Sequence, residues 1–267
     1  MANLSNYLAN ILLDYVKGGT GVTPPATTYF ALMKTMPTAS GGGVEVSGGS
    51  YARVAVTNNS SNWPASSGGS KTNANSINFG TATADWGTVV GVAEFDASSG
   101  GNLLTFSTLN GGPVTILNGT PYSIPAGSGQ DFGVQLTNLS TYLADRMNDW
   151  FHGGGSYSVP ATTYFSPMTT LPSAGGTGGV ESAAFSRLAK TNNSTNWPAA
   201  SGQTKSNGTS LDFGNASSNT SIVGIAEYDA SSGGNVLTFG ALSNAPFAAA
   251  SGQDFQIPIN GAVYQAA

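Results

Sequence analysis

The feature that most constrains the fold is a repeat that runs along the whole chain. Four motifs occur twice in the same order: PATTYF at 25–30 and 160–165, TNNSSNWPA and TNNSTNWPA at 57–65 and 191–199, GVAEFDASSGGN and GIAEYDASSGGN at 91–102 and 224–235, and SGQDF at 128–132 and 251–255. Collinear repeats of this length indicate a duplicated structural unit. We therefore predict two homologous modules, the first module at residues 1–137 and the second module at residues 138–267.

The last motif breaks the spacing of the other three. Those pairs lie 133–135 positions apart, whereas the two SGQDF motifs lie 123 positions apart. If they are equivalent, Asp131 and Asp254 are counterparts, and the second module has lost ten residues relative to the segment 110–125. The segment QLTN at 135–138 runs straight into the start of the second module without a linker, so we expect the two modules to lie close together.

Each module begins with a short amphipathic helix. Apolar residues recur there every three or four positions: Leu4, Tyr7, Leu8, Ile11, Leu12 and Tyr15 in the first module, and Leu139, Tyr142, Leu143, Met147, Trp150 and Phe151 in the second. Asn3 is a suitable N-cap for the first helix, and Asn138 precedes the second. Helices of about 14 residues are marginal in isolation. Each apolar stripe must therefore pack on its own module or on a neighbour.

The rest of each module reads as short strands separated by turns. TTYFALM at 27–33, its counterpart TTYFSPM at 162–168 and the alternating YARVAVT at 51–57 are rich in β-branched and aromatic residues. The apolar runs that end at DASSGGN lead into further strand-like runs, and Asp, Ser and Gly favour a tight connection, so we predict a hairpin. The fold class is mainly β, with two β-sandwich-like modules.

The composition narrows the classes of partner and chemistry. Charged residues make up 8% of the chain, against roughly 25% in typical globular domains, and such charge-poor surfaces suit burial against other subunits. The net charge is −5 without a Lys/Arg cluster, so we expect no nucleic-acid partner. No apolar run approaches the ~18 residues of a membrane span, so we expect no membrane partner. The chain has no cysteine, which excludes thiolate metal sites and thiol nucleophiles.

Glu94 and Asp96, with their counterparts Glu227 and Asp229, are the strongest catalytic candidates. Residues two apart on a strand share a face, and paired carboxylates can cleave glycosides. The favoured interpretation is structural: the aspartate opens a turn, and the glutamate pairs with the arginine of its module, Arg53 in the first. DASSGGN has one carboxylate, too few for a calcium loop. We therefore predict no catalytic residue, no metal site and no cofactor.

His152 and two tryptophans have structural interpretations as well. His152 aligns with Lys17 at the end of a predicted helix, where the helix dipole favours a cation. Trp63 and Trp197 lie in NNSSNWPA and NNSTNWPA, where a tryptophan before proline anchors the loop on the core. The alternative is a platform on which a sugar ring stacks.

The order of motifs in the first module resembles a group of small tailed-phage structural proteins, usually labelled tail-fibre-like or virion proteins. NLSNYLANILLDYV precedes PPATTYFALMKTMPT, GGVEVSGGSYARVAVT and INFGTATADWGTVVGVAEFDASSGGNLLTF. The positions that carry the resemblance are 25–32, 45–56, 79–90 and 91–104. The second module departs from it, because SGGSYAR becomes ESAAFSR and ATADWGTV becomes ASSNTSIV. The resemblance implies a location in the virion and contact with other virion proteins.

These observations predict a non-enzymatic structural protein of a bacteriophage particle. We expect a capsid decoration or cement protein that binds the coat lattice, because long fibres use many short repeats or coiled coils and two globular modules give little reach. The alternatives are a tail fibre, baseplate or tail-adaptor component, or a carbohydrate-binding module that contacts host glycans. Expected partners are the major capsid protein or tail proteins, and copies of the chain itself. The expected assembly contacts are Tyr7, Ile11, Tyr15, Tyr142, Trp150, Phe151, Trp63 and Trp197.

Overall fold

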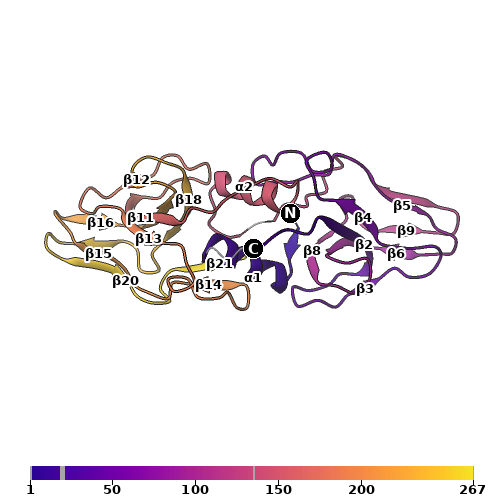
Figure 1. Cartoon of the computed structure of the whole chain (residues 1–267), viewed down its shortest axis with the longest axis horizontal. Coiled ribbons are helices and arrows are strands. Elements are labelled where there is room, and N and C mark those ends of the chain that lie inside the picture. Colours follow the sequence, from indigo (N-terminus) through magenta and orange to yellow (C-terminus); the bar gives the residue numbers. More distant parts are fainter. Residues whose placement is uncertain (1, 19–21, 135, 267) are drawn as a thin grey trace.

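The chain folds into two β modules at opposite ends of an elongated molecule, with both helices between them (Figure 1). The computed structural model describes residues 2–18, 22–134 and 136–266. The prediction of a mainly β chain with two tandem modules is confirmed.

The first module has one principal sheet and two short strand pairs. Its elements are β1 (Asn3–Leu4), α1 (Asn6–Val16), β2 (Thr27–Thr35), β3 (Val44–Glu45), β4 (Val54–Thr57), β5 (Ile77–Thr81), β6 (Gly87–Val89), β7 (Gly91–Phe95), β8 (Leu103–Thr108), β9 (Val114–Ile116) and β10 (Pro121–Ile124). The principal sheet has the order β1-β8-β7-β2-β3, with β4 also paired to β2, while β5 pairs with β10 and β6 with β9. All these pairings are antiparallel.

The second module repeats this plan. Its elements are α2 (Thr141–Phe151), β11 (Thr162–Thr170), β12 (Val180–Glu181), β13 (Leu188–Thr191), β14 (Thr204–Ser206), β15 (Leu211–Asn215), β16 (Thr220–Ile222), β17 (Gly224–Tyr228), β18 (Val236–Ala241), β19 (Phe247–Ala249), β20 (Asp254–Ile257) and β21 (Val263–Gln265). Its principal sheet has the order β12-β11-β17-β18 with β13 paired to β11, and the pairs β15-β20 and β16-β19 match β5-β10 and β6-β9. β14 pairs with β21.

The core of each module lies between the principal sheet and the short strand pairs. In the first module Phe30 and Val92, from β2 and β7, pack with Ile77, Ile116 and Ile124, from the short pairs. Burying apolar side chains between two such layers contributes roughly 25 cal/mol per Å² removed from water. This two-layer packing confirms the β-sandwich-like prediction.

The predicted hairpin joins β7 to β8. Asp96 Oδ1 accepts a hydrogen bond from the Asn102 backbone N–H at 2.7 Å, and Gly100 and Gly101 take positive φ angles of 60° and 73°. The second module repeats this turn with Asp229 and Asn235. The aspartate therefore closes a turn, as its position in DASSGGN predicts.

Both helices begin two residues later than the sequence pattern predicts. The N-caps are Ser5 and Ser140, whose hydroxyls accept hydrogen bonds from the backbone N–H of Leu8 and Leu143 at 3.1 and 3.2 Å. The expectation of Asn3 as N-cap is wrong, because Asn3 already pairs in β1.

The predicted loss of ten residues from the second module is also wrong. The turns before β10 and β20 are equivalent: the Gly119 N–H donates to Ala82 O and the Gly252 N–H to Ala216 O, both at 2.7 Å. Gly119 and Gly252 lie 133 positions apart and Ala82 and Ala216 lie 134 apart, within the range of 133–135 that the earlier motifs have. The two SGQDF motifs therefore fall on different parts of the fold.

Asp131 and Asp254 are consequently not counterparts. Asp254 opens β20, whereas Asp131 lies outside any strand and its Oδ1 accepts from the Lys71 backbone N–H at 3.1 Å. The buried apolar positions set the true register, since Ile124 of β10 and Ile257 of β20 occupy the same place in their modules. A short polar motif in a turn carries no such constraint.

Candidate functional site: the junction between the modules

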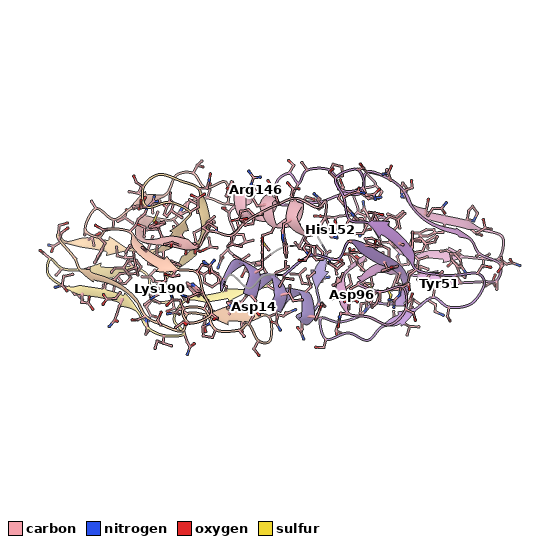
Figure 2. All side chains as sticks on the ribbon, in the orientation of Figure 1. Asp14, Tyr51, Asp96, Arg146, His152 and Lys190 are labelled. Atoms are coloured by element: carbon pink, nitrogen blue, oxygen red, sulfur yellow. The ribbon has the colours of Figure 1, made fainter. Side chains whose placement is uncertain are left out.

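Each helix starts on its own module and ends in the other one. At the start of α1 the Ser5 N–H donates to Leu104 O of β8, and at the start of α2 the Ser140 N–H donates to Leu237 O of β18, both at 2.9 Å. Figure 2 shows Asp14 and His152 near the centre of the molecule, whereas Tyr51 and Lys190 lie out in the first and second modules. The later turns of both helices therefore lie at the junction of the modules.

A basic side chain at the end of each helix reaches a buried glutamate of the opposite module. Lys17, after α1, forms an ion pair with Glu227 of β17. His152, after α2, lies with its Nε2 2.8 Å from Glu94 Oε1 on β7. All four residues are at most 1% exposed. The two glutamates occupy matching register positions, Glu94 opposite Phe30 and Glu227 opposite Phe165.

A second pair of ion pairs surrounds the first. Asp14 of α1 accepts from Lys205 Nζ at 2.6 Å, and Asp149 of α2 accepts from Lys71 Nζ at 2.7 Å. Both lysines are buried, and each aspartate also accepts a backbone hydrogen bond from the opposite module. The contacts are reciprocal, as at the isologous interface of a symmetric dimer, although one chain supplies both halves.

Two asparagines hold the ends of the helices. Asn192 Nδ2 donates to Val16 O at 2.9 Å, and its Oδ1 accepts from the Gly18 N–H at 2.6 Å. Asn58 makes the same two bonds to Phe151 and Gly153. Gly18 and Gly153 both have φ 124°, which L side chains rarely adopt, so the chain can leave each helix this way only at glycine.

The centre of the junction is apolar. Tyr15 of α1 and Trp150 of α2 stack with ring centroids 4.0 Å apart and an interplanar angle of 10°. The surrounding cluster includes Leu12, Met147 and Leu237, so it draws on both helices and on the second sheet. An aromatic pair of this kind adds about 0.5–1.5 kcal/mol beyond the area it buries. The junction is thus a third core, shared by the two modules.

Burial and neighbouring charges shift the pKa values of several buried groups at the junction. Burial lowers the pKa of Lys17 below its ordinary value, against the opposing charge and hydrogen bond of Glu227. Burial alone would raise the pKa of Glu94, but the charge and hydrogen bond of His152, with the hydrogen bond from Thr105, hold it below the ordinary value. Burial, aided by Glu227, raises the pKa of Tyr264 well above its ordinary range. These groups depend on one another across the junction.

The structure corrects the expected partner of the glutamates. Arg53 does not pair with Glu94; it binds Glu45 at 2.9 Å, and its guanidinium lies 3.6 Å from the centre of the Phe95 ring. In the second module Arg187 pairs with Glu181 in the same way. Arg53 also donates to the Ala97 carbonyl in the hairpin turn, which explains why it stays beside that loop. The interpretation of His152 as a dipole partner is likewise incomplete, since its ring binds Glu94.

Glu94 and Asp96, the strongest catalytic candidates in the first module, bind different partners. Glu94 binds His152 and Thr105, whereas Asp96 binds the backbone and side chain of Asn102 in the turn. Among residues 2–18, 22–134 and 136–266, no group of three or more His, Asp and Glu side chains is arranged to hold a metal ion. The arrangement holds modules together and offers no paired carboxylates to a substrate.

The structure places the eight expected assembly residues very differently from one another. Tyr15, Trp150 and Phe151 are buried in the junction, Ile11 and Tyr142 are partly exposed, and Tyr7 is 44% exposed. Trp63 and Trp197 are at most 1% exposed in the module cores; the Trp63 ring lies 4.6 Å from that of His152, and Lys17 Nζ lies 5.0 Å from the Trp197 ring. Neither tryptophan offers a ring face to a sugar. Among these eight residues only Tyr7, Ile11 and Tyr142 are exposed enough to contact another virion protein, and that contact stays a prediction.

The sequence patterns did not predict that Lys17, Glu227, Lys205 and Lys71 join the modules. A signal was present, because an acid on each helix and a lysine in each sandwich recur in both modules, and a basic residue, Lys17 or His152, follows each helix. The repeat conceals which module supplies the partners, however, since the charged residues of each helix have equivalent partners in both modules.

The comparisons with known proteins agree with the division of the chain into two modules. None of the described helices is long and apolar enough to cross a membrane. No curated protein matches the chain. The family model described as podophage GP4 fiber I protein gp80 matches twice, at residues 3–130 and 138–265, so the two matches have equal lengths and each contains one helix and its sandwich. The chain is therefore a tandem duplication that belongs to the podophage GP4 fiber I protein gp80 family and is a component of the virion.

Proposed function

We propose that this chain is a non-enzymatic building block of a phage tail fibre, in which the two modules act as one rigid unit. The observation that supports this proposal most strongly is the fibre family's match to both modules. The family favours the tail-fibre alternative over capsid decoration, which was the leading expectation from composition. The same match makes other virion proteins the class of partner.

The junction suits a fibre component because it restricts motion between the modules. Two helices cross between the modules in opposite directions. Three ion pairs and the contact between His152 and Glu94 join them to the opposite sandwiches. A rotation of one module against the other would separate buried charges, which costs several kcal/mol per unpaired ion. The chain therefore keeps a fixed distance and orientation between its two modules, with two described helices of only 11 residues each.

The contacts that link this unit to its neighbours lie on surfaces that the fold leaves open. Val44 of β3 and Val180 of β12 occupy the same place in the two modules and are 49% and 53% exposed. Tyr7 adds an exposed aromatic ring beside the junction. Exposed apolar residues at repeated positions allow one chain to contact two equivalent partner sites. Contact with host glycans, the other alternative, would have to use surfaces other than Trp63 and Trp197.

Immunogold electron microscopy of purified particles tests the proposal. We expect an antibody against the folded chain to label the fibres at the tail, with a few to some dozens of copies per particle by densitometry. Label spread over the head, with hundreds of copies, would instead support capsid decoration.

A further inference from the structure

The second module contains a cavity of about 460 Å³ beside β18. Its walls are largely apolar and include Ile225, Phe239, Leu242, Ile257 and Val263. Buried Glu227 and Thr238 also line it. Glu227 already accepts from Thr238 at 2.8 Å and pairs with Lys17, so its charge is balanced from inside the protein. A cavity of this character suits a neutral ligand with an apolar flank.

In the first module a glutamine side chain occupies the corresponding place. Gln130 is 4% exposed, and its Nε2 donates to Ser107 Oγ at 2.6 Å and to Thr108 O at 3.2 Å. Its Oε1 accepts from the Asn110 backbone N–H at 2.9 Å. Both ends of the carboxamide are therefore bound along the far end of β8.

Two sequence differences between the modules leave the corresponding space in the second module without a side chain. Phe132 and Tyr264 are equivalent, because each pairs through its backbone with the buried lysine of its module, Lys71 or Lys205. Each also packs edge-on against the module tryptophan, at 5.4 and 5.5 Å. Two residues before them stand Gln130 in the first module and Ala262 in the second.

The second substitution lies on the sheet. Ser107 pairs with Val92, and its counterpart Gly240 pairs with Ile225. Gly240 and Ala262 both line the cavity, and so do Ala241 and Ser243, the counterparts of Thr108 and Asn110. The second module thus keeps the backbone positions that bind the carboxamide, while it lacks the side chain that fills the space.

We propose that this cavity binds a glutamine side chain of a partner polypeptide in the virion. The carboxamide would accept from the Ser243 N–H and donate to the Ala241 carbonyl, as Gln130 does at Asn110 and Thr108. Its methylene groups would lie against Ile225 and Leu242. The cavity is larger than one side chain, so residues flanking the glutamine enter it as well. Gln130 itself is the evidence for the occupant, since it is a polypeptide glutamine bound by the same backbone.

Solution NMR of the full chain tests this proposal with N-acetyl-L-glutamine methylamide as the probe. We expect saturable shifts of the Ala241 and Ser243 backbone amides at millimolar concentrations, which are typical of a ligand with few contacts. N-acetyl-L-glutamate methylamide is the matched control, and it should bind at least tenfold more weakly because its carboxylate cannot donate to the Ala241 carbonyl and carries a charge.

The variant Gly240→Ser/Ala262→Gln recreates the arrangement of the first module and should abolish these shifts. It has room to fold, because a Cβ at Gly240 would meet only Asn138 Nδ2, at 3.7 Å. Its melting temperature should equal or exceed that of the parent chain. The proposal is overturned if the glutamine probe causes no shifts at these amides, if the double variant binds it as well as the parent does, or if N-acetylglucosamine shifts them and the glutamine probe does not. The last result would indicate a site for an acetamido sugar.

Discussion

Replacing Lys17 with methionine should lower the free energy of unfolding by about 3–5 kcal/mol. The variant keeps the apolar stem but leaves Glu227, which is 1% exposed, without its opposing charge. An uncompensated charge in such a place must be protonated or hydrated, and either process weakens the folded state. Urea unfolding of the purified chain, followed by tryptophan fluorescence, measures the change.

Two further variants control this experiment. Lys34→Met removes an exposed lysine and should change the free energy of unfolding by less than about 0.5 kcal/mol. Lys17→Met/Glu227→Gln removes both charges and should recover much of the loss, because a buried ion pair replaced as a pair is often neutral. A loss below about 1 kcal/mol for Lys17→Met alone would show that α1 does not deliver this cation to the second module.

Replacing Trp150 with alanine should destabilise the chain by about 3–5 kcal/mol, the usual range for removing a large buried aromatic side chain. Trp150 is 6% exposed and stacks on Tyr15, so the substitution opens a cavity where the two helices meet. The same unfolding measurement gives the value. Tyr7→Ala is the matched control: Tyr7 is 44% exposed, and its loss should leave stability within about 0.5 kcal/mol.

These two variants also divide the helices into a part that builds the junction and a part available to partners. Tyr7→Ala should fold normally, so any loss of incorporation into particles would report a contact. Equal destabilisation by Trp150→Ala and Tyr7→Ala would contradict the packing of the helices described above.

Much of the architecture could be predicted from the sequence because strong local patterns encode it. The strands that hold Phe30 and Phe165 combine β-branched and aromatic residues, and the turn at Asp96 has both the acid and the glycines that it needs. The apolar stripes also predict the two helices at their correct places in the chain. Their first residues were misjudged, because Ser5 and Asn3 are both good caps and only the pairing of β1 decides between them.

The junction could not be predicted, and the reason is the repeat itself. Asp14 would meet a lysine in either module, Lys71 in its own or Lys205 in the other, and Lys17 would likewise meet Glu94 or Glu227. Local charge and hydropathy are identical for the two choices. Because each module supplies the same charged partners, no local sequence pattern distinguishes the crossed arrangement from the uncrossed one.

The cavity of the second module was missed for a different reason. The SGQDF motifs align Gln130 with residue 253. In the structure the counterpart of Gln130 is Ala262. Only the register of buried residues reveals that a filled position in one module is open in the other.

The crossed helices should make the two modules a single cooperative unit. Scanning calorimetry of Phe255→Ala tests it directly, because Phe255 packs on Phe185, Phe213 and Phe247 in the second module, away from the junction. The substitution should remove about 3–5 kcal/mol. We expect one transition, shifted to lower temperature, whose calorimetric and van't Hoff enthalpies agree. Two resolved transitions, with the first module melting at the temperature of the parent chain, would show that the modules unfold independently and would contradict a single cooperative unit.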